Sequence, residues 1–351
     1  LAIDRNQGER ADGLVEAALK LEPANSAIQR DAAVFWLNRG QVERGLQHLS
    51  LALEARPATN QDLLDIFLRF AEDPEARVTL KPLAQNPPPW WPAFFKRLAQ
   101  RALNVDAVRY AYGLRTLASQ TPVAPEERQA YIQRLLKEGL ITEAYLTWVN
   151  GLTPPERREM GLLHNGSFEM ALGEEAPFDW QWHPHRQVVA RTAASLGVAG
   201  ERALQLVFRG QEGRFQHLRQ ILYLDSGTYR LSGKVKLEGL ASKVGLRWTL
   251  RCLHPNQAVL GESERFLGSG KWRSFTMDFE VPEDCQLQDI RLESAGRQGL
   301  GMRISGEIWF DDLAIRRTTG LTAAARADGL ARERETGETE PGTEDSSFEW
   351  G

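Results

Sequence analysis

Val244-Gly-Leu-Arg-Trp-Thr-Leu-Arg-Cys252 alternates apolar and polar side chains over its whole length. Successive side chains of an extended strand point to opposite faces. One face of this stretch therefore carries the leucines and Trp248, and the other carries Arg247, Thr249 and Arg251. A pattern of this kind predicts a strand with one side in a core and the other toward water.

Similar runs recur on both sides of this stretch at intervals of about 10–15 residues, with Gly, Asp, Asn or Pro between them. They cover residues 203–208, 216–224, 228–237, 273–281, 290–294 and 304–315. Short strands at regular spacing are typical of an antiparallel β-sandwich or jelly roll. We predict such a domain over residues 161–317.

Before residue 160 the hydrophobic period is helical, and the chain repeats. Residues 11–23 align with residues 45–57 at an offset of 34, which pairs Pro23 with Pro57 and Ala18 with Ala52. A repeat of this length, with small residues at the helix crossing and proline after the second helix, indicates stacked helical hairpins. Further helices are expected over residues 60–72, 93–103, 105–119, 126–138 and 141–151.

Residues 26–59 resemble a tetratricopeptide repeat, with Trp36 on the first helix and Gly40 at the turn. They depart from the family where Ala32-Ala33 replaces Leu-Gly and Gly45 replaces Ala. The resemblance implies an α-helical repeat (solenoid) domain over residues 1–160 that recruits a protein partner. Trp90 and Trp91, which prolines flank, are the candidate contact residues. Packing between helices is the alternative for both.

Three motifs mark the strand-rich region in order: Asn165-Gly-Ser-Phe-Glu169, Gly227-Thr-Tyr-Arg-Leu-Ser-Gly-Lys-Val235 and Ile308-Trp-Phe-Asp-Asp-Leu-Ala-Ile315. Together they resemble carbohydrate-binding modules with a galactose-binding-like jelly roll. The resemblance covers residues 162–317 and implies the fold. It suggests carbohydrate binding without requiring it, because this fold hosts many functions.

The first candidate carbohydrate site is the stretch Phe178-Asp-Trp-Gln-Trp-His-Pro-His185. Trp180 and Trp182 project to the same side of an extended chain. Either ring is a candidate platform for the C–H face of a sugar, with hydrogen bonds from His183, His185 or Asp179. The alternative is that both indoles seal the core of the sandwich. The two histidines lack a third ligand for a metal.

The second candidate is the polar face of the alternating strands. Its candidate residues are His217, Arg219, Tyr223, Arg247 and Arg251, with Lys234 and Lys236 on a further strand. If these strands are neighbours, they form a shallow basic surface for an anionic polysaccharide or for the acidic face of a partner. A face that is merely solvated is the alternative.

A structural metal site is the third candidate. If the first and last strands of the jelly roll pair, Glu169 lies near Asp311 and Asp312. Carboxylates with backbone carbonyls suit Ca²⁺, and the resembled modules often hold calcium there. The alternative is that these carboxylates cap backbone amides or pair with Arg. Such calcium would be structural, and we expect no required cofactor.

The net charge of −4, from 43 basic and 47 acidic residues, gives no basic footprint of a nucleic-acid binder. Residues 318–351 hold eight acidic residues and three arginines, and we predict a disordered acidic tail there. No apolar run is long enough to span a membrane. Because the chain begins with Leu1, we leave open a signal or membrane anchor upstream of it.

Catalytic motifs are missing from the sequence. There is no Gly-x-Ser-x-Gly elbow, no phosphate-binding loop and no convincing pair of carboxylates for glycoside hydrolysis. Cys252 is either a small buried residue or the disulfide partner of Cys285 in an oxidising compartment.

These features predict a non-enzymatic adaptor, in the periplasm or membrane-anchored and facing it, that links a protein partner to an envelope polysaccharide. A scaffold that binds no glycan and a glycan-processing enzyme are the alternatives.

Overall fold

A computed structural model describes residues 2–57, 61–118, 121–173, 177–195, 200–254, 256–296 and 303–318, with the side chains of residues 2–8 and 118 left aside. The chain forms two compact units. The first, which we call the helical unit, runs to Arg158 and takes in Phe178. The second, the β unit, begins at Glu159 and continues from Asp179. The predicted acidic tail lies outside the described residues, apart from Thr318.

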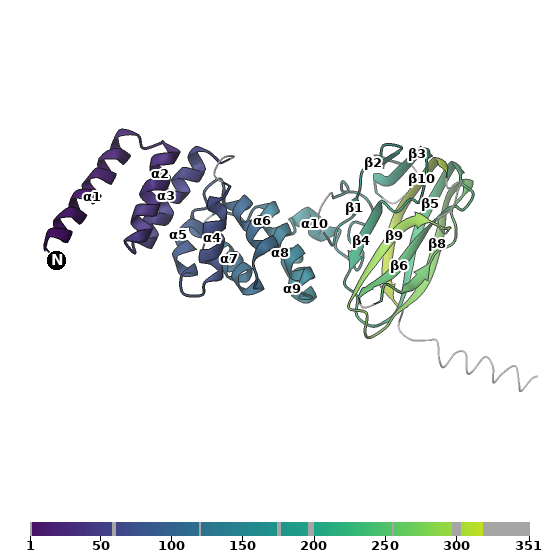
Figure 1. Ribbon diagram of the computed structural model, residues 1–351. Coiled ribbons are helices and arrows are strands. Elements are labelled where there is room, and N and C mark those ends of the chain that lie inside the picture. The colour runs from purple at the N-terminus through teal and green to yellow at the C-terminus, as the bar shows by residue number, and fades with distance from the viewer. Residues whose placement is uncertain are drawn as a thin grey trace, which may run out of the picture. The chain divides into compact units, whose positions relative to one another are not determined.

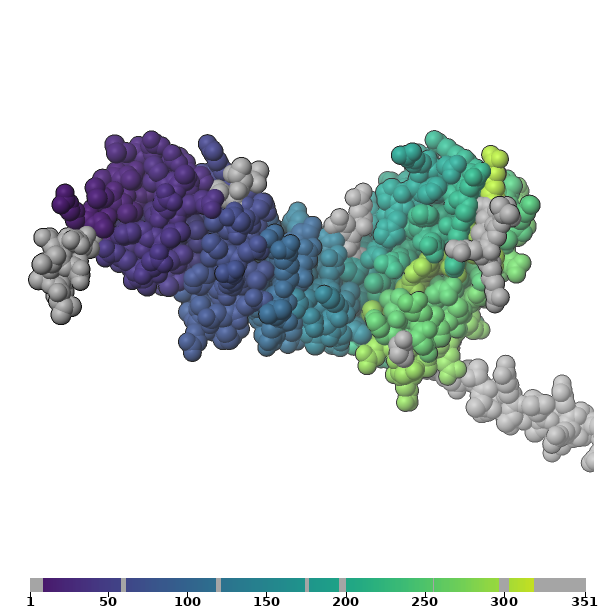
Figure 2. Space-filling model, in the orientation of Figure 1, coloured from purple at the N-terminus to yellow at the C-terminus, as the bar shows by residue number. Residues whose placement is uncertain are grey.

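The helical unit consists of α-helices and one 3₁₀ turn, η1 (Arg77–Leu80). The helices are α1 (Ala2–Leu21), α2 (Ser26–Asn38), α3 (Val42–Ala55), α4 (Leu63–Glu72), α5 (Lys81–Gln85), α6 (Trp91–Arg101), α7 (Val105–Ala118), α8 (Pro125–Lys137), α9 (Ile141–Asn150) and α10 (Pro154–Arg158). Each of α2, α6 and α8 packs against the helix that follows it, and α6 also packs against α4. Their side chains form one continuous surface, coloured purple to blue in Figure 2. The predicted helical character is confirmed, while the solenoid stays a prediction.

The α2–α3 hairpin shows why the repeat needs small residues. Asn25 begins α2, because its side chain accepts hydrogen bonds from the backbone N–H groups of Ala27 and Ile28. Gly40 connects the helices with a positive φ of 74°, which glycine adopts without strain. A Cβ at Gly45 would lie 2.6 Å from Leu37 Cγ, so glycine allows α3 to approach α2 closely.

The β unit is an antiparallel sandwich of two five-stranded sheets (Figure 1). Its strands are β1 (Gln181–Trp182), β2 (Val188–Ala194), β3 (Arg202–Gln211), β4 (Leu218–Leu222), β5 (Gly227–Ala241), β6 (Leu246–His254), β7 (Val259–Glu262), β8 (Gly268–Val281), β9 (Leu287–Ser294) and β10 (Ile304–Arg317). One sheet has the order β1-β4-β9-β6-β7 and the other β2-β3-β10-β5-β8. The apolar faces of both sheets enclose one core. The predicted β-sandwich is confirmed.

The opening motif of this unit is a turn and not the predicted first strand. Asn165 and Phe168 have positive φ angles of 48° and 56°, which break an extended strand. The motif still lies against β10, because the Leu313 N–H donates to the Gly166 carbonyl at 2.9 Å. A Cβ at Gly166 would collide with the Leu313 carbonyl oxygen. Only glycine therefore allows this contact between the two ends of the unit.

Cys252 and Cys285 form a disulfide, with their Cα atoms 5.7 Å apart. The bond joins β6 to the segment that precedes β9. Of the two possibilities that the sequence left open for Cys252, it is therefore the disulfide partner of Cys285. None of the described helices combines the length and the apolar character needed to cross a bilayer.

Candidate functional site

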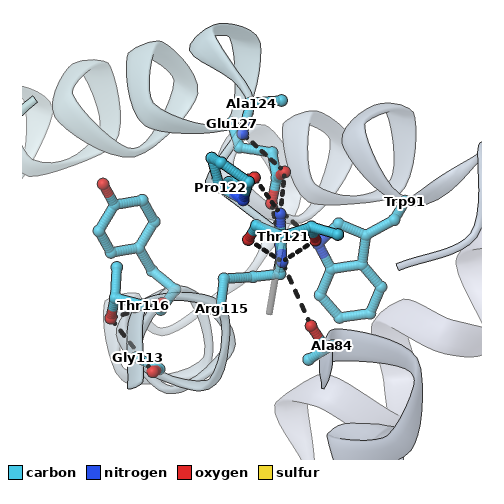
Figure 3. Close-up of polar contacts among 10 residues, drawn as sticks. Ala84, Trp91, Gly113, Arg115, Thr116, Thr121, Pro122, Ala124 and Glu127 are labelled. Atoms are coloured by element: carbon cyan, nitrogen blue, oxygen red, sulfur yellow. Dashed lines mark hydrogen bonds and ion pairs between the residues drawn. The ribbon is translucent and has the colours of Figure 1, made fainter. Parts of the chain in front are cut away.

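Trp90 and Trp91 lie inside the helical unit, so the expected exposed contact pair is wrong. The exposed fraction is 5% for Trp90 and 0% for Trp91. The indole N–H of Trp90 donates to Ser50 Oγ at 3.2 Å. The indole N–H of Trp91 donates to Glu127 Oε2 at 2.9 Å (Figure 3). Trp90 follows the prolines directly and caps α6, Trp91 is its first residue, and both rings pack against Phe94. The tryptophans therefore serve as core residues.

Trp180 is also buried, which contradicts its expected role as a sugar platform. Its exposed fraction is 0%, and its ring packs against Phe168 and Trp248 with centroid distances of 5.4 and 5.6 Å. Its indole N–H donates to the Asn165 carbonyl at 3.0 Å. The physical reason is that the shared side of Trp180 and Trp182 is the core side of the sheet. Trp182 packs against that core but is only half-buried.

Trp182 lies beside three histidines where β1 meets β4. The His183 N–H donates to the His217 carbonyl at 2.9 Å, and the His185 and His217 rings are 5.0 Å apart. Burial lowers the pKa of His217, and His185 and His183 lower it further. We call His183, His185 and His217 the histidine cluster. The structure brings together these three predicted residues and Trp182.

A second group of predicted residues shares the outer face of the sheet β1-β4-β9-β6-β7. One row of cross-strand neighbours crosses four strands: Gln181, Arg219, Arg291 and Thr249. Arg247 and Arg251 flank Thr249 on β6, and Tyr223 comes directly after the last residue of β4. We call Gln181, Arg219, Arg247, Thr249, Arg251, Asp289, Arg291 and Glu293 the arginine face. Lys234 and Lys236 belong to β5 in the other sheet, so their expected place on this face is wrong.

Two buried carboxylates on β9 order the arginines of this face. Asp289, with an exposed fraction of 0%, accepts from Arg291 Nη2 at 2.6 Å and Nε at 3.2 Å through Oδ2. Glu293 pairs with Arg251 Nη2 at 2.6 Å and with Arg214. Burial favours the neutral form of Glu293, but the Thr249 side chain and the guanidinium groups of Arg251 and Arg214 outweigh it and hold its pKa below the ordinary value. Glu293 is therefore charged at neutral pH.

Arg219 differs from its neighbours because it forms no ion pair among the described residues. Its Nε donates to Gln181 Oε1 at 2.8 Å. Burial lowers the pKa of Arg219, and the adjacent positive charge of Arg291 lowers it further, while Asp289 opposes the shift. The guanidinium group of Arg219 is thus half-buried next to a like charge.

The structure separates the three predicted metal ligands into two settings. Asp311 is fully buried, and neither of its carboxylate oxygens has a hydrogen-bond partner among the described residues. Burial raises the pKa of Asp311 to about 7, and the negative charges of Asp312 and Glu169 add to this effect. Glu169 lies close by and accepts from the Glu201 N–H at 2.9 Å.

Asp312 points to a different partner. A bulge interrupts the pairing of β10 with β5 between Asp311 and Ala314, and Asp312 has a φ of 52° there. Its carboxylate pairs with Lys234 Nζ at 2.6 Å. An orphaned buried carboxylate beside Glu169 fits a hard cation, and Asp311 and Glu169 would hold it. Within the described ranges, no group of three or more His, Cys, Asp or Glu side chains could hold a metal ion. Backbone oxygens would have to complete the shell.

Among the comparisons with known proteins, only solved structures match this chain. No family model and no curated protein matches the chain. Among solved structures, a CBM4 module is 18% identical over 44% of this chain and 99% of its own, with a TM-score of 0.33. The CBM22 xylan-binding domain of Paenibacillus barcinonensis is 17% identical over 44% and 93%, with a TM-score of 0.29. A CBM61 module in complex with β-1,4-galactotriose is 18% identical over 45% and 99%, with a TM-score of 0.30.

Proposed function

We propose that the β unit binds a polysaccharide, without catalysis, on the arginine face. The observation that carries this proposal is the row of Gln181, Arg219, Arg291 and Thr249 across four neighbouring strands. Within this row Gln181 and Thr249 are buried, and the partly exposed guanidinium groups of Arg219 and Arg291 are the ones a ligand can reach. Such fixed donors match a ligand rich in hydroxyl groups, because orientation in a binding site comes from a few fixed polar groups. The half-buried ring of Trp182 lies beside the histidine cluster on the core side of the same sheet, so it is not part of the arginine face.

Affinity electrophoresis in gels that contain neutral or acidic polysaccharides tests this function. We expect at least one polymer to retard the full chain, and we expect Arg219→Ala to weaken that retardation. Arg230→Gln is the matched control, since Arg230 is exposed on β5 in the other sheet and pairs with Asp278. The proposal is wrong if no polymer retards the protein, or if the control variant loses binding as strongly as Arg219→Ala.

For the helical unit we propose the recruitment of a protein partner, which makes the whole chain an adaptor. A groove between α6 and α8 supports this role, and its lining is Ala99, Gln100, Ala130, Gln133, Arg134 and Lys137. A pull-down with the full chain and with Lys137→Glu tests it. Loss of a specific partner in the variant is the expected result. A partner retained together with no polysaccharide binding would favour the scaffold alternative.

We propose a periplasmic location, either free or membrane-anchored. The Cys252–Cys285 disulfide supports an oxidising compartment, because cytosolic thiols are kept reduced. Alkylation of intact cells followed by mass spectrometry tests this location. Cysteines protected until a reductant is added agree with it, and cysteines labelled directly contradict it.

We also propose a structural Ca²⁺ between Glu169 and Asp311. The support is the buried carboxylate of Asp311, whose two oxygens have no hydrogen-bond partner within the described ranges. A Ca²⁺ concentration 100 times the dissociation constant would stabilise the fold by about 2.7 kcal/mol. Thermal unfolding in Ca²⁺ and in EDTA measures this effect.

We expect Asp311→Asn to lose the stabilisation by Ca²⁺ and Asp312→Asn to keep it. The second variant is a matched control, because Asp312 pairs with Lys234 instead. Equal Ca²⁺ responses in both variants would place the ion elsewhere.

A further inference from the structure

We propose that the polysaccharide is acidic and that one of its carboxylates lies between the guanidinium groups of Arg219 and Arg291. This inference rests on the proposed function, because it names the ligand class for the same face. Arg219 on β4 and Arg291 on β9 are direct cross-strand neighbours. Such neighbours have Cβ atoms about 4.5–5.5 Å apart, which is within the reach of two guanidinium groups to one carboxylate.

Among the described residues, Asp289 is the one carboxylate that acts on both arginines. Asp289 uses its Oδ2 atom for both hydrogen bonds with Arg291, and its Oδ1 atom has no partner among the described residues. Arg219 donates to the neutral amide of Gln181. Like charges that face each other across strands are destabilising. Arg219 therefore lies next to Arg291 at a cost in free energy that its hydrogen bond to a neutral amide does not remove. An anionic ligand removes the repulsion and supplies the missing acceptor.

The charges of the surrounding face agree with this assignment. Five guanidinium groups, those of Arg214, Arg219, Arg247, Arg251 and Arg291, meet three carboxylates, those of Glu262, Asp289 and Glu293. Two positive charges therefore remain in excess. Asp289 and Glu293 are buried beneath the arginines, while Arg251 and Arg291 keep exposed fractions of 23% and 21% in their side chains. The accessible part of the face is consequently more positive than the composition of the strands suggests.

An acidic sugar polymer fits this face better than an acidic protein segment. Protein interfaces obtain most of their affinity from large apolar or aromatic anchors in desolvated pockets. Among the described strand residues of this sheet, Val259 at the β7 edge is the one large apolar residue that is exposed. The centre of the face instead offers hydrogen-bonding groups in register across adjacent strands, which suits hydroxyl and carboxylate groups along an extended polymer.

Acidic polymers with and without their carboxylates test the inference. The probes are polygalacturonate, alginate and hyaluronate, each beside its carboxyl-reduced form, with titration calorimetry on the full chain. We expect at least one acidic polymer to bind about tenfold or more tightly than its reduced form, since charge-assisted hydrogen bonds are the stronger kind. We also expect its affinity to fall as salt is raised.

Arg219→Gln should lose most of that tenfold preference and leave binding of the reduced polymer unchanged. Because Arg219 has no ion pair within the described ranges, its variant should unfold at the wild-type temperature. Arg230→Gln on the other sheet should keep the preference.

The outcomes separate the inference from the function on which it rests. Equal binding of acidic and reduced polymers would overturn the acidic class and leave polysaccharide binding intact. Failure of every neutral and acidic polymer to bind would overturn both. Binding of poly-glutamate at the affinity of the best acidic polymer would also overturn the inference, because the face would then select charge on any chain and an acidic protein would serve equally well.

Discussion

Glu127 shows how one buried charge orders the helical unit (Figure 3). Its side chain is 1% exposed and accepts from Arg115, from Trp91 and from the Ala124 N–H. Arg115 is 2% exposed and also donates to the carbonyls of Ala84 and Pro122. The pair thus joins α5, α6, α7 and α8. Its hydrogen bonds satisfy both buried charges, which is the condition for tolerating them.

We expect Glu127→Gln to lower the free energy of unfolding by about 3–5 kcal/mol, because it leaves the buried charge of Arg115 without a counter-ion. Urea unfolding measures the loss. Glu126→Gln is the matched control on the same helix, since Glu126 is exposed and should have little effect. A loss of the same size in both variants would contradict the role of the buried pair.

Asp311 makes the stability of the β unit depend on pH when Ca²⁺ is absent. Its pKa is about 7 in the folded protein, above the ordinary value of 3.8. The folded state therefore disfavours the ionised form. Its contribution to stability is fully present below the ordinary pKa and is lost as pH rises to about 7.

In EDTA we expect Asp311→Asn to become more stable relative to wild type as pH rises from about 4 to about 7, with a constant difference above that. Comparing the two proteins isolates Asp311 from carboxylates such as Glu293, whose lowered pKa has the opposite effect. Chemical unfolding at a series of pH values measures the difference. A difference independent of pH would show that Asp311 is not held in its buried, uncharged form.

At the scale of elements, the α2–α3 hairpin depends on Gly45. A Cβ at this position would lie 3.2 Å from the Ala33 carbonyl oxygen in addition to its contact with Leu37. We expect Gly45→Val to cost about 1–3 kcal/mol, because α3 must move away from α2. Thermal unfolding measures the cost.

Gly13 on α1 gives the matched comparison. A Cβ there meets nothing within 4 Å. Gly13→Ala should therefore stabilise the helix by about 0.5–1 kcal/mol. A stabilising effect of substitution at both glycines would mean that Gly45 does not set the helix separation.

Strand alternation predicted that several residues of the arginine face lie on the same side, but it did not predict all the residues of that face. Arg219, Arg247 and Arg251 share one face, as their positions in the sequence indicated. The strand expected over residues 290–294 begins earlier, at Leu287, so Asp289 was missed. The alternation of Asp289, Arg291 and Glu293 with apolar residues along β9 is the sequence pattern that could have identified Asp289. The pairing of Arg291 with Arg219 required knowledge of the strand order, which local periodicity does not contain.

At the scale of the molecule, the Cys252–Cys285 disulfide closes a loop between residues 33 apart in the sequence. In the chain-entropy account, a loop of this size contributes about 3–4 kcal/mol. We expect Cys252→Ser with Cys285→Ser to destabilise the β unit by this amount. Hydrogen exchange by mass spectrometry should show faster exchange in β6 and β9, with α2 and α3 unchanged. Equal acceleration in both units would contradict a local effect of the disulfide.

The sequence by itself determined that the chain is helical before about residue 160 and rich in strands after it, and which side of each predicted strand is apolar. These properties follow from periods of two and 3.6 residues, which act between near neighbours along the chain. The tertiary structure decided which strands are neighbours, that Lys234 lies in the other sheet from Arg219, and that Trp91 and Trp180 are buried. It also joined Cys252 to Cys285 and left Asp311 without a hydrogen-bond partner among the described residues. These outcomes depend on packing between distant segments, and no local pattern records which segments will meet.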